Sequence, residues 1–223
     1  MRENNQTYHL TLAGNLPVLV TGRTDQRGDM VYFDSQKNES FVFRNNIVRD
    51  HRRYGVLLQS GYGLIENNRF ENSSNSAITI QNGVDWGEGL VAEHLLIRNN
   101  LFVNNGYDLN YFENKRACVH IQMSKLDNVN ATGNWSDVAP ALWRGMKHIT
   151  IENNDFVNWT GKAIHVVSAD QIKIQNNHFS QKKDYSDIRI FVQNADVKEE
   201  NNVSTSTISI HPESIVTQIF CYD

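Results

Sequence analysis

Two short stretches of the sequence combine carboxylates with aromatic rings or guanidinium groups, and chemistry could take place there. The first is Asp85-Trp86-Gly87-Glu88-Gly89, where acids flank an indole ring and glycines let the backbone bend sharply. Aromatic faces stack on the apolar faces of pyranose rings, and carboxylates bind hydroxyl groups or act as acid and base. The stretch predicts a sugar-binding loop; the alternative is a solvated loop with an incidental Trp.

The second stretch is Arg49-Asp50-His51-Arg52-Arg53-Tyr54-Gly55. An arginine pair near a carboxylate such as Asp50 could hold sugar hydroxyls or keep an acid ionised. We expect Arg52 and Arg53, with His51 and Tyr54 beside them, to contact a substrate. A charged turn in water is the alternative.

A repeated unit has to position both stretches. It consists of an apolar residue, a polar residue, two asparagines, any residue and a second apolar residue. Its copies are Phe43–Val48, Ile65–Phe70, Ile97–Phe102, Ile151–Phe156, Ile174–Phe179 and a degraded Val197–Asn202. The first asparagines of successive pairs are 22, 32, 54, 23 and 25 residues apart. A period near 22 to 25 residues predicts a solenoid.

The segments between the copies indicate which solenoid it is. They contain short runs that alternate inward apolar and outward polar residues, namely Val56–Leu58, Ala77–Ile80, Val119–Ile121, Ala163–Val167 and Ile188–Val192. We expect two short strands per repeat and an all-β fold, a right-handed parallel β-helix. The paired asparagines then suit the left-handed corners and can bond to one another from coil to coil. Coils about 4.8 Å apart would let residues of adjacent coils share one site.

The irregular steps predict loops that leave the stack. The step of 32 residues has its excess in Gln81–Leu90. We interpret the step of 54 as two coils plus about ten residues, with Leu126–Asn130 in place of the missing asparagine pair. Its surplus falls in Tyr107–Asn114 and Trp135–Trp143, which are rich in aromatic rings and carboxylates. Loops on the same side of a β-helix would form a groove.

Outside the coils, residues 1–40 alternate like a small antiparallel β-module, and residues 41–223 form the β-helix with a C-terminal cap over Ile208–Tyr222. Cys118 is expected to be a buried free thiol. We interpret His120 and His165, which lie in strand runs, as structural histidines.

Bulk properties exclude several classes of partner. A net charge of −4 argues against a nucleic-acid partner. No apolar run reaches the roughly 20 residues that cross a bilayer, and the first residues lack the apolar core of a signal peptide. No carboxylate cluster has calcium-ligand spacing, so neither a metal nor another cofactor is expected.

The succession His51–Leu57, Gly63–Phe70, Ala77–Ile80, Trp86–Gly89 and Ile97–Asn100 resembles the later coils of glycoside hydrolase family 110. The resemblance implies an inverting exo-α-galactosidase of gut or marine bacteria, secreted or periplasmic, that removes terminal α-1,3-linked galactose. It makes Glu88 the candidate catalytic carboxylate and lets Trp86 and Arg52 line the sugar site. The family also has a Gly-Asp-Asp type motif in coils before the β-module, which this chain lacks, so an upstream part of the same enzyme could supply it.

Inversion requires a second carboxylate about 6.5–9.5 Å from the first. Asp85 and Asp50 are the candidates for this role, with Asp108 as a further possibility. Two rivals remain: a polysaccharide lyase or epimerase on the same fold, which would need cations to neutralise a uronate, and a non-catalytic glycan-binding or surface β-helix. Fold alone does not choose among them.

Overall fold

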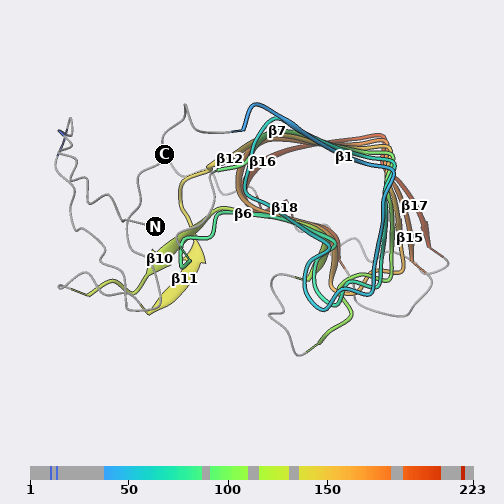
Figure 1. Cartoon of the computed structure of the whole chain (residues 1–223), viewed down its shortest axis with the longest axis horizontal. Coiled ribbons are helices and arrows are strands. Elements are labelled where there is room, and N and C mark those ends of the chain that lie inside the picture. The colour runs from blue at the N-terminus through green and yellow to red at the C-terminus, as the bar shows by residue number, and fades with distance from the viewer. Residues whose placement is uncertain are drawn as a thin grey trace, which may run out of the picture.

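The computed structural model describes residues 38–86, 91–109, 116–130, 136–181, 188–206 and 217–218, with the single positions Thr11 and Gly14. In these parts the regular elements are β-strands, stacked in parallel into three faces around one core (Figure 1). The fold is the expected right-handed parallel β-helix. The proposed module of residues 1–40 lies almost entirely outside the described residues, as does most of the proposed C-terminal cap.

Each face contains one strand from every coil. The first face contains β1 (Phe41–Arg44), β4 (Gly63–Glu66), β7 (Glu93–Arg98), β12 (Met146–Glu152) and the later halves of β14 (Lys162–Gln175) and β16 (Ile188–Glu200). The second contains β2 (Ile47–Arg49), β5 (Arg69–Glu71), β8 (Leu101–Val103), β13 (Asp155–Val157), β15 (His178–Gln181) and β17 (Val203–Ser206). The third contains β3 (Val56–Leu58), β6 (Ile78–Gln81), β9 (Ala117–Gln122), the earlier halves of β14 and β16, and β18 (Thr217–Gln218).

The coil therefore has three strands, and the expectation of two per repeat was wrong. The apolar runs recognised in the sequence all belong to the third face, where the strands have three to six residues or continue into longer ones. Several strands of the second face have only three residues, as in β5 and β8. Three residues are too few for alternation to be visible, so the second-face strand that follows each Asn pair left no signal in the sequence.

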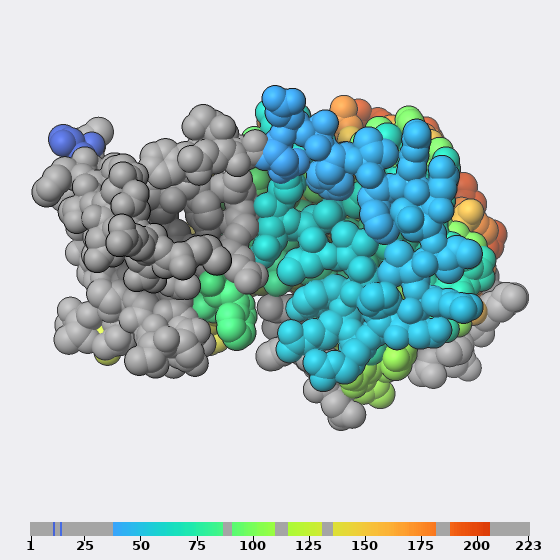
Figure 2. Space-filling view, viewed as in Figure 1, coloured from blue at the N-terminus to red at the C-terminus, as the bar shows by residue number. Residues whose placement is uncertain are grey.

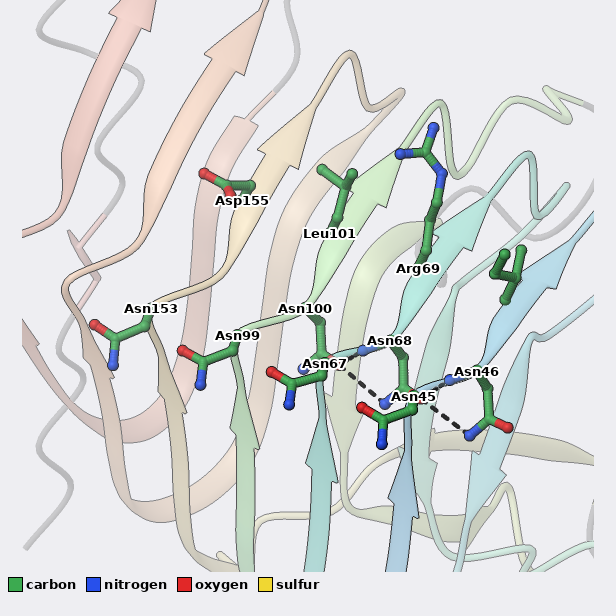
Figure 3. Close-up of a pocket in the computed structure, with 11 residues that line it drawn as sticks. Asn45, Asn46, Asn67, Asn68, Arg69, Asn99, Asn100, Leu101, Asn153 and Asp155 are labelled. Carbon is green, nitrogen blue, oxygen red and sulfur yellow. Dashed lines mark hydrogen bonds between the residues drawn. The ribbon is translucent and has the colours of Figure 1, made fainter.

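The corner between the first and second faces, here called the asparagine corner, is closed by a ladder of side-chain amides (Figure 3). The second asparagine of each pair donates from Nδ2 to Oδ1 of the next, at 3.0–3.1 Å, through Asn46, Asn68, Asn100, Asn154, Asn177 and Asn202. The first asparagine of each pair has a left-handed φ between 52° and 60°. Both expected roles of the asparagine pairs are thus confirmed.

The ladder corrects the interpretation of the 54-residue step. Asn100 bonds directly to Asn154, and β7 pairs directly with β12, so this step is one coil. Asn128 is left-handed, with φ of 52°, but it follows β10 and lies outside the ladder. Most of the surplus leaves the stack between β9 and β12, in the connection that contains the expected Trp135–Trp143 stretch, and the rest falls between β8 and β9, where Tyr107–Asn114 was expected. Within the first of these connections, β10 (Ser124–Asp127) and β11 (Asp137–Pro140) pair as an antiparallel hairpin.

The core repeats from coil to coil in the same way as the corner. Four phenylalanines of the second face stack with ring centroids 4.8–5.2 Å apart, namely Phe70, Phe102, Phe156 and Phe179. Isoleucines of the first face, such as Ile65 and Ile97, are fully buried beside them. Because identical positions stack at the strand spacing, each coil presents the next with a matching apolar surface.

The first coil, β1 to β3, forms one end of the described stack. Figure 2 shows its residues in blue on the near surface. In the described part of the chain, these strands are the terminal ones of their faces. Accordingly Val42, Ile47 and Leu57 are exposed, and the core residues Phe41 and Phe43 are only partly buried.

Candidate functional site

Two long connections leave the third corner, where the third face leads into the next coil's first face. One runs from Asn82 to Ala92 between β6 and β7, and the other from Met123 to Gly145 between β9 and β12. The Asn82 amide joins them, because Nδ2 donates to the Ser124 carbonyl at 2.9 Å and Oδ1 accepts from the Ser124 amide at 2.8 Å. Two loops that are far apart in the sequence thus leave the stack next to each other.

The first of these loops presents Asp85 and Trp86. The Trp86 amide donates to the Gly83 carbonyl at 3.2 Å, and this turn leaves the indole 63% exposed while Asp85 is half-buried. Glu88, with Gly87 and Gly89, lies outside the described residues. The described part of the loop therefore provides an exposed aromatic platform with a carboxylate next to it in sequence.

The second connection adds an aromatic residue that was not among the predicted site residues. Trp143 is 57% exposed and Leu142 is 86% exposed. Asn194 braces this turn, since its Nδ2 donates to the Ala141 and Leu142 carbonyls at 3.2 and 3.0 Å and its Oδ1 accepts from Arg144 at 3.3 Å. The aromatic-rich surplus over Trp135–Trp143 was the sequence signal for this platform. Figure 1 shows the neighbouring hairpin, β10 and β11, projecting from the coils.

The arginine-rich stretch lies at the second corner, between the second and third faces. Asp50 has a left-handed φ of 59° and accepts a hydrogen bond from Asn72 Nδ2 at 3.0 Å. Its side chain is 65% exposed and lies 3.9 Å from Nε of Arg49. His51, Arg52 and Arg53 are exposed and Tyr54 is half-buried.

Backbone hydrogen bonds bring Asp108 to the same corner. The Ser74 amide donates to the His51 carbonyl at 2.8 Å, and the Asp108 amide donates to the Ser74 carbonyl at 2.9 Å. Six polar residues of the connections at this corner are buried, namely Ser73, Ser74, Asn75, Ser76, Asn105 and Arg116. Backbone segments of three successive coils therefore adjoin at the second corner, namely the Asp50–Tyr54 stretch, Ser74 and Asp108.

The predicted site residues thus fall into two groups at different corners. Asp85 and Trp86 lie at one end of the third-face strands, and the stretch from Asp50 to Tyr54 lies at the other. A single sugar site that included both would have to extend across the third face. The catalytic and binding roles of these residues remain predictions.

His120 and His165 form a pair on the third face, between the two corners. They occupy the strand positions that alternate with the core residues. His120 and His165 are 0% and 3% exposed, their rings stack at 4.7 Å, and their Nδ1 atoms are 2.8 Å apart. One ring must therefore carry its proton on Nδ1 while the other does not. Burial, with lesser effects from His120 and Lys162, holds the pKa of His165 well below its usual value. Their burial and mutual contact fit the structural role expected of both histidines.

Other expectations concern single groups. Cys118 is buried, as predicted, and forms no disulfide in the described part of the chain. In the described ranges, no three His, Cys, Asp or Glu side chains gather in a way that could hold a metal ion. Those ranges also contain no helix long and apolar enough to span a bilayer.

Comparison with known proteins agrees with this geometry. The chain is similar to alpha-1,3-galactosidase B of Akkermansia muciniphila, with 31% identity over 179 residues, or 79% of this chain and 20% of that protein. Proteins of the same name from Parabacteroides distasonis and Phocaeicola vulgatus are 25% identical over 146 residues, which is 65% of this chain and 22% and 23% of theirs. The chain spans about a fifth of the length of these relatives. Residues 29–185, more than half of the chain, match the right-handed β-helix region family, and the chain belongs to that family.

Proposed function

We propose that this chain is a carbohydrate-active β-helix of the glycoside hydrolase kind and binds glycans that end in α-linked galactose. The observation that carries the proposal is the third corner, where the exposed indoles of Trp86 and Trp143 lie on neighbouring loops of a rigid stack. Exposed aromatic rings with few convergent polar groups suit sugar recognition. The three relatives share the name alpha-1,3-galactosidase B, which supports α-1,3-linked galactose as the terminal sugar of the glycan.

In this proposal Glu88 acts as catalytic acid or base and Asp85 or Asp50 assists it. Inversion needs the two carboxyl groups about 6.5–9.5 Å apart, with a water molecule between them. Asp85 is only three residues from Glu88 in the same loop, whereas Asp50 belongs to the second corner. Asp85 is therefore the better partner within this chain.

The test is release of free galactose from a glycan that ends in α-1,3-linked galactose. We expect the parent protein to release galactose and Glu88→Gln to lose at least a hundredfold in rate, because the general acid or base is removed. Glu200→Gln is the matched control, since this exposed carboxylate ends β16 beside the asparagine corner, away from both third-corner loops, and its loss should leave the rate unchanged. Equal rates for the parent and Glu88→Gln would refute the catalytic assignment.

The second candidate function is non-catalytic glycan binding. It is favoured by the length of the chain, which corresponds to about a fifth of each relative, so that catalytic residues of the whole enzymes could lie elsewhere. In that case neither the parent nor Glu88→Gln releases galactose, and both bind the glycan equally. Measuring binding and release on the same samples separates the two functions.

A further inference from the structure

The outer side of the asparagine corner is hollowed into a groove of about 540 Å³ that runs along the stack (Figure 3). Its floor is formed by the first asparagine of each pair in four coils, namely Asn45, Asn67, Asn99 and Asn153. Ile47, Arg69, Leu101 and Asp155 of the second face line the other side. We call this surface the asparagine groove. It lies at a different corner from the loops of Asp85 and Trp86.

The side-chain amides of the first asparagines form no part of the ladder. The ladder uses the second asparagine of each pair, whereas the side chains of the first asparagines make no hydrogen bond within the described part of the chain. These side chains are exposed and project in parallel from successive coils (Figure 3). Strands that stack about 4.8 Å apart set the spacing of this amide row.

Backbone conformation alone does not require asparagine there. Left-handed positions elsewhere in the same coils are occupied by Asp50, Tyr62, His94, Ser168 and Gln171, with φ between 52° and 59°. In contrast, the equivalent position of the groove is asparagine in every coil, from Asn45 to Asn201. A requirement for the amide itself, in addition to the corner, explains this uniformity.

The charges of the groove favour a neutral ligand. Arg69 is paired with Glu71, and Asp155 Oδ1 lies 3.3 Å from Nδ1 of His178, so both charged side chains in the lining already have a polar neighbour. The rest of the lining consists of amides, which both donate and accept hydrogen bonds, and the aliphatic side chains of Ile47 and Leu101. Such a lining matches a molecule with many hydroxyl groups and apolar ring faces.

We propose that the asparagine groove binds a neutral polysaccharide that lies lengthwise along the stack, so that successive sugars face successive coils. The site is separate from the third corner and does not depend on the proposed galactosidase activity. The asparagine groove would bind the middle of a polysaccharide chain, whereas the third corner would bind the end of a glycan. A groove of this size falls within the range of known ligand sites.

The experiment measures binding to two soluble neutral polymers, a galactan and a mixed-linkage glucan, by affinity electrophoresis. We expect at least one polymer to retard the parent protein, and Asn67→Gly combined with Asn99→Gly to weaken that binding at least tenfold. Glycine keeps the left-handed backbone and removes only the amide. The matched control combines Asn72→Gly with Asn104→Gly, which are also left-handed asparagines, at the second corner. This control should bind as the parent does.

Three results would overturn the proposal. The first is that neither polymer retards the parent. The second is that the groove variant and the control lose binding equally while both keep the parent's circular dichroism. The third is tighter binding of an acidic polymer, polygalacturonate, than of both neutral ones. None of these results bears on galactose release, so the groove and the hydrolase proposal can fail separately.

Discussion

The asparagine corner and the third corner belong to the same coils but differ in how freely their sequences vary. At the asparagine corner each coil has the same two residues in the same conformation, and the buried amide of one coil bonds to the next. At the third corner, β14 and β16 continue without a break, Gln59–Tyr62 is a short connection, and the excursion between β9 and β12 is long. The residues there include left-handed His94 and His148 as well as an exposed Trp86.

The two corners differ because their polar groups find their hydrogen-bond partners in different places. A buried amide needs a partner in the coil above and in the coil below, so a change in one coil disturbs its neighbours. The long third-corner loops run on the surface, where water satisfies their polar groups, so insertions are tolerated and can present aromatic side chains. The uniform corner therefore stabilises the fold, and the variable corner is where sites differ.

Breaking the ladder in its middle should have the largest effect. Asn100→Ala removes the donor to Asn154 and to the Ile65 carbonyl, both at 3.0 Å, and the acceptor for Asn68. Because these groups are buried and left unsatisfied, we expect the free energy of unfolding to fall by about 3–5 kcal/mol. Equilibrium unfolding in urea measures it.

Asn46→Ala is the matched control for this prediction. Asn46 is at the end of the ladder, is only half-buried, and bonds through Nδ2 to Asn68 and to the Arg44 carbonyl. We expect a loss of about 1 kcal/mol. Equal losses for the two variants would mean that the ladder is not cooperative and that only local corner geometry matters.

The same difference explains how far the sequence could be interpreted. The asparagine pairs predicted the ladder and the β-helix, because a residue that bonds to its own equivalent must recur at each coil. The number of coils between Asn99 and Asn153 was predicted wrongly from the residue spacing, because a loop of any length can be inserted without disturbing the ladder. Trp143 was missed for a related reason: a single exposed ring has no periodic signal, and only its brace by Asn194 shows that it is held in place.

The third face should make stability depend on pH. The pKa of His165 is lowered in the folded protein because the ring is buried, so its contribution is fully present above the unfolded pKa of about 6.5. As the pH falls below that value the unfolded chain binds the proton first, and stability declines by at most about 1.4 kcal/mol per pH unit until the folded pKa is reached. Urea midpoints at pH 7.5 and 5.5 measure the decline.

His165→Phe separates this effect from that of the other histidines. Phenylalanine continues the row, because Phe191 already stacks on His165 at 5.0 Å, and it cannot bind a proton. We expect the variant to lose less stability than the parent between the two pH values, whatever its absolute stability. An unchanged pH dependence would show that His165 is already protonated in the folded protein at pH 5.5.

The smallest effect on stability is expected at the variable corner. Trp143→Ala should change the free energy of unfolding by less than about 0.5 kcal/mol, because the indole is 57% exposed. The same substitution should weaken binding of a glycan that ends in α-linked galactose, if the indole is one of the platforms for that sugar. Tyr107→Ala is the control, since this ring is 51% exposed but belongs to the second corner. A stability loss of several kcal/mol in Trp143→Ala would place the ring among the packing elements of the coil, and the contrast between a corner fixed by the ladder and a variable corner with exposed loops would no longer hold.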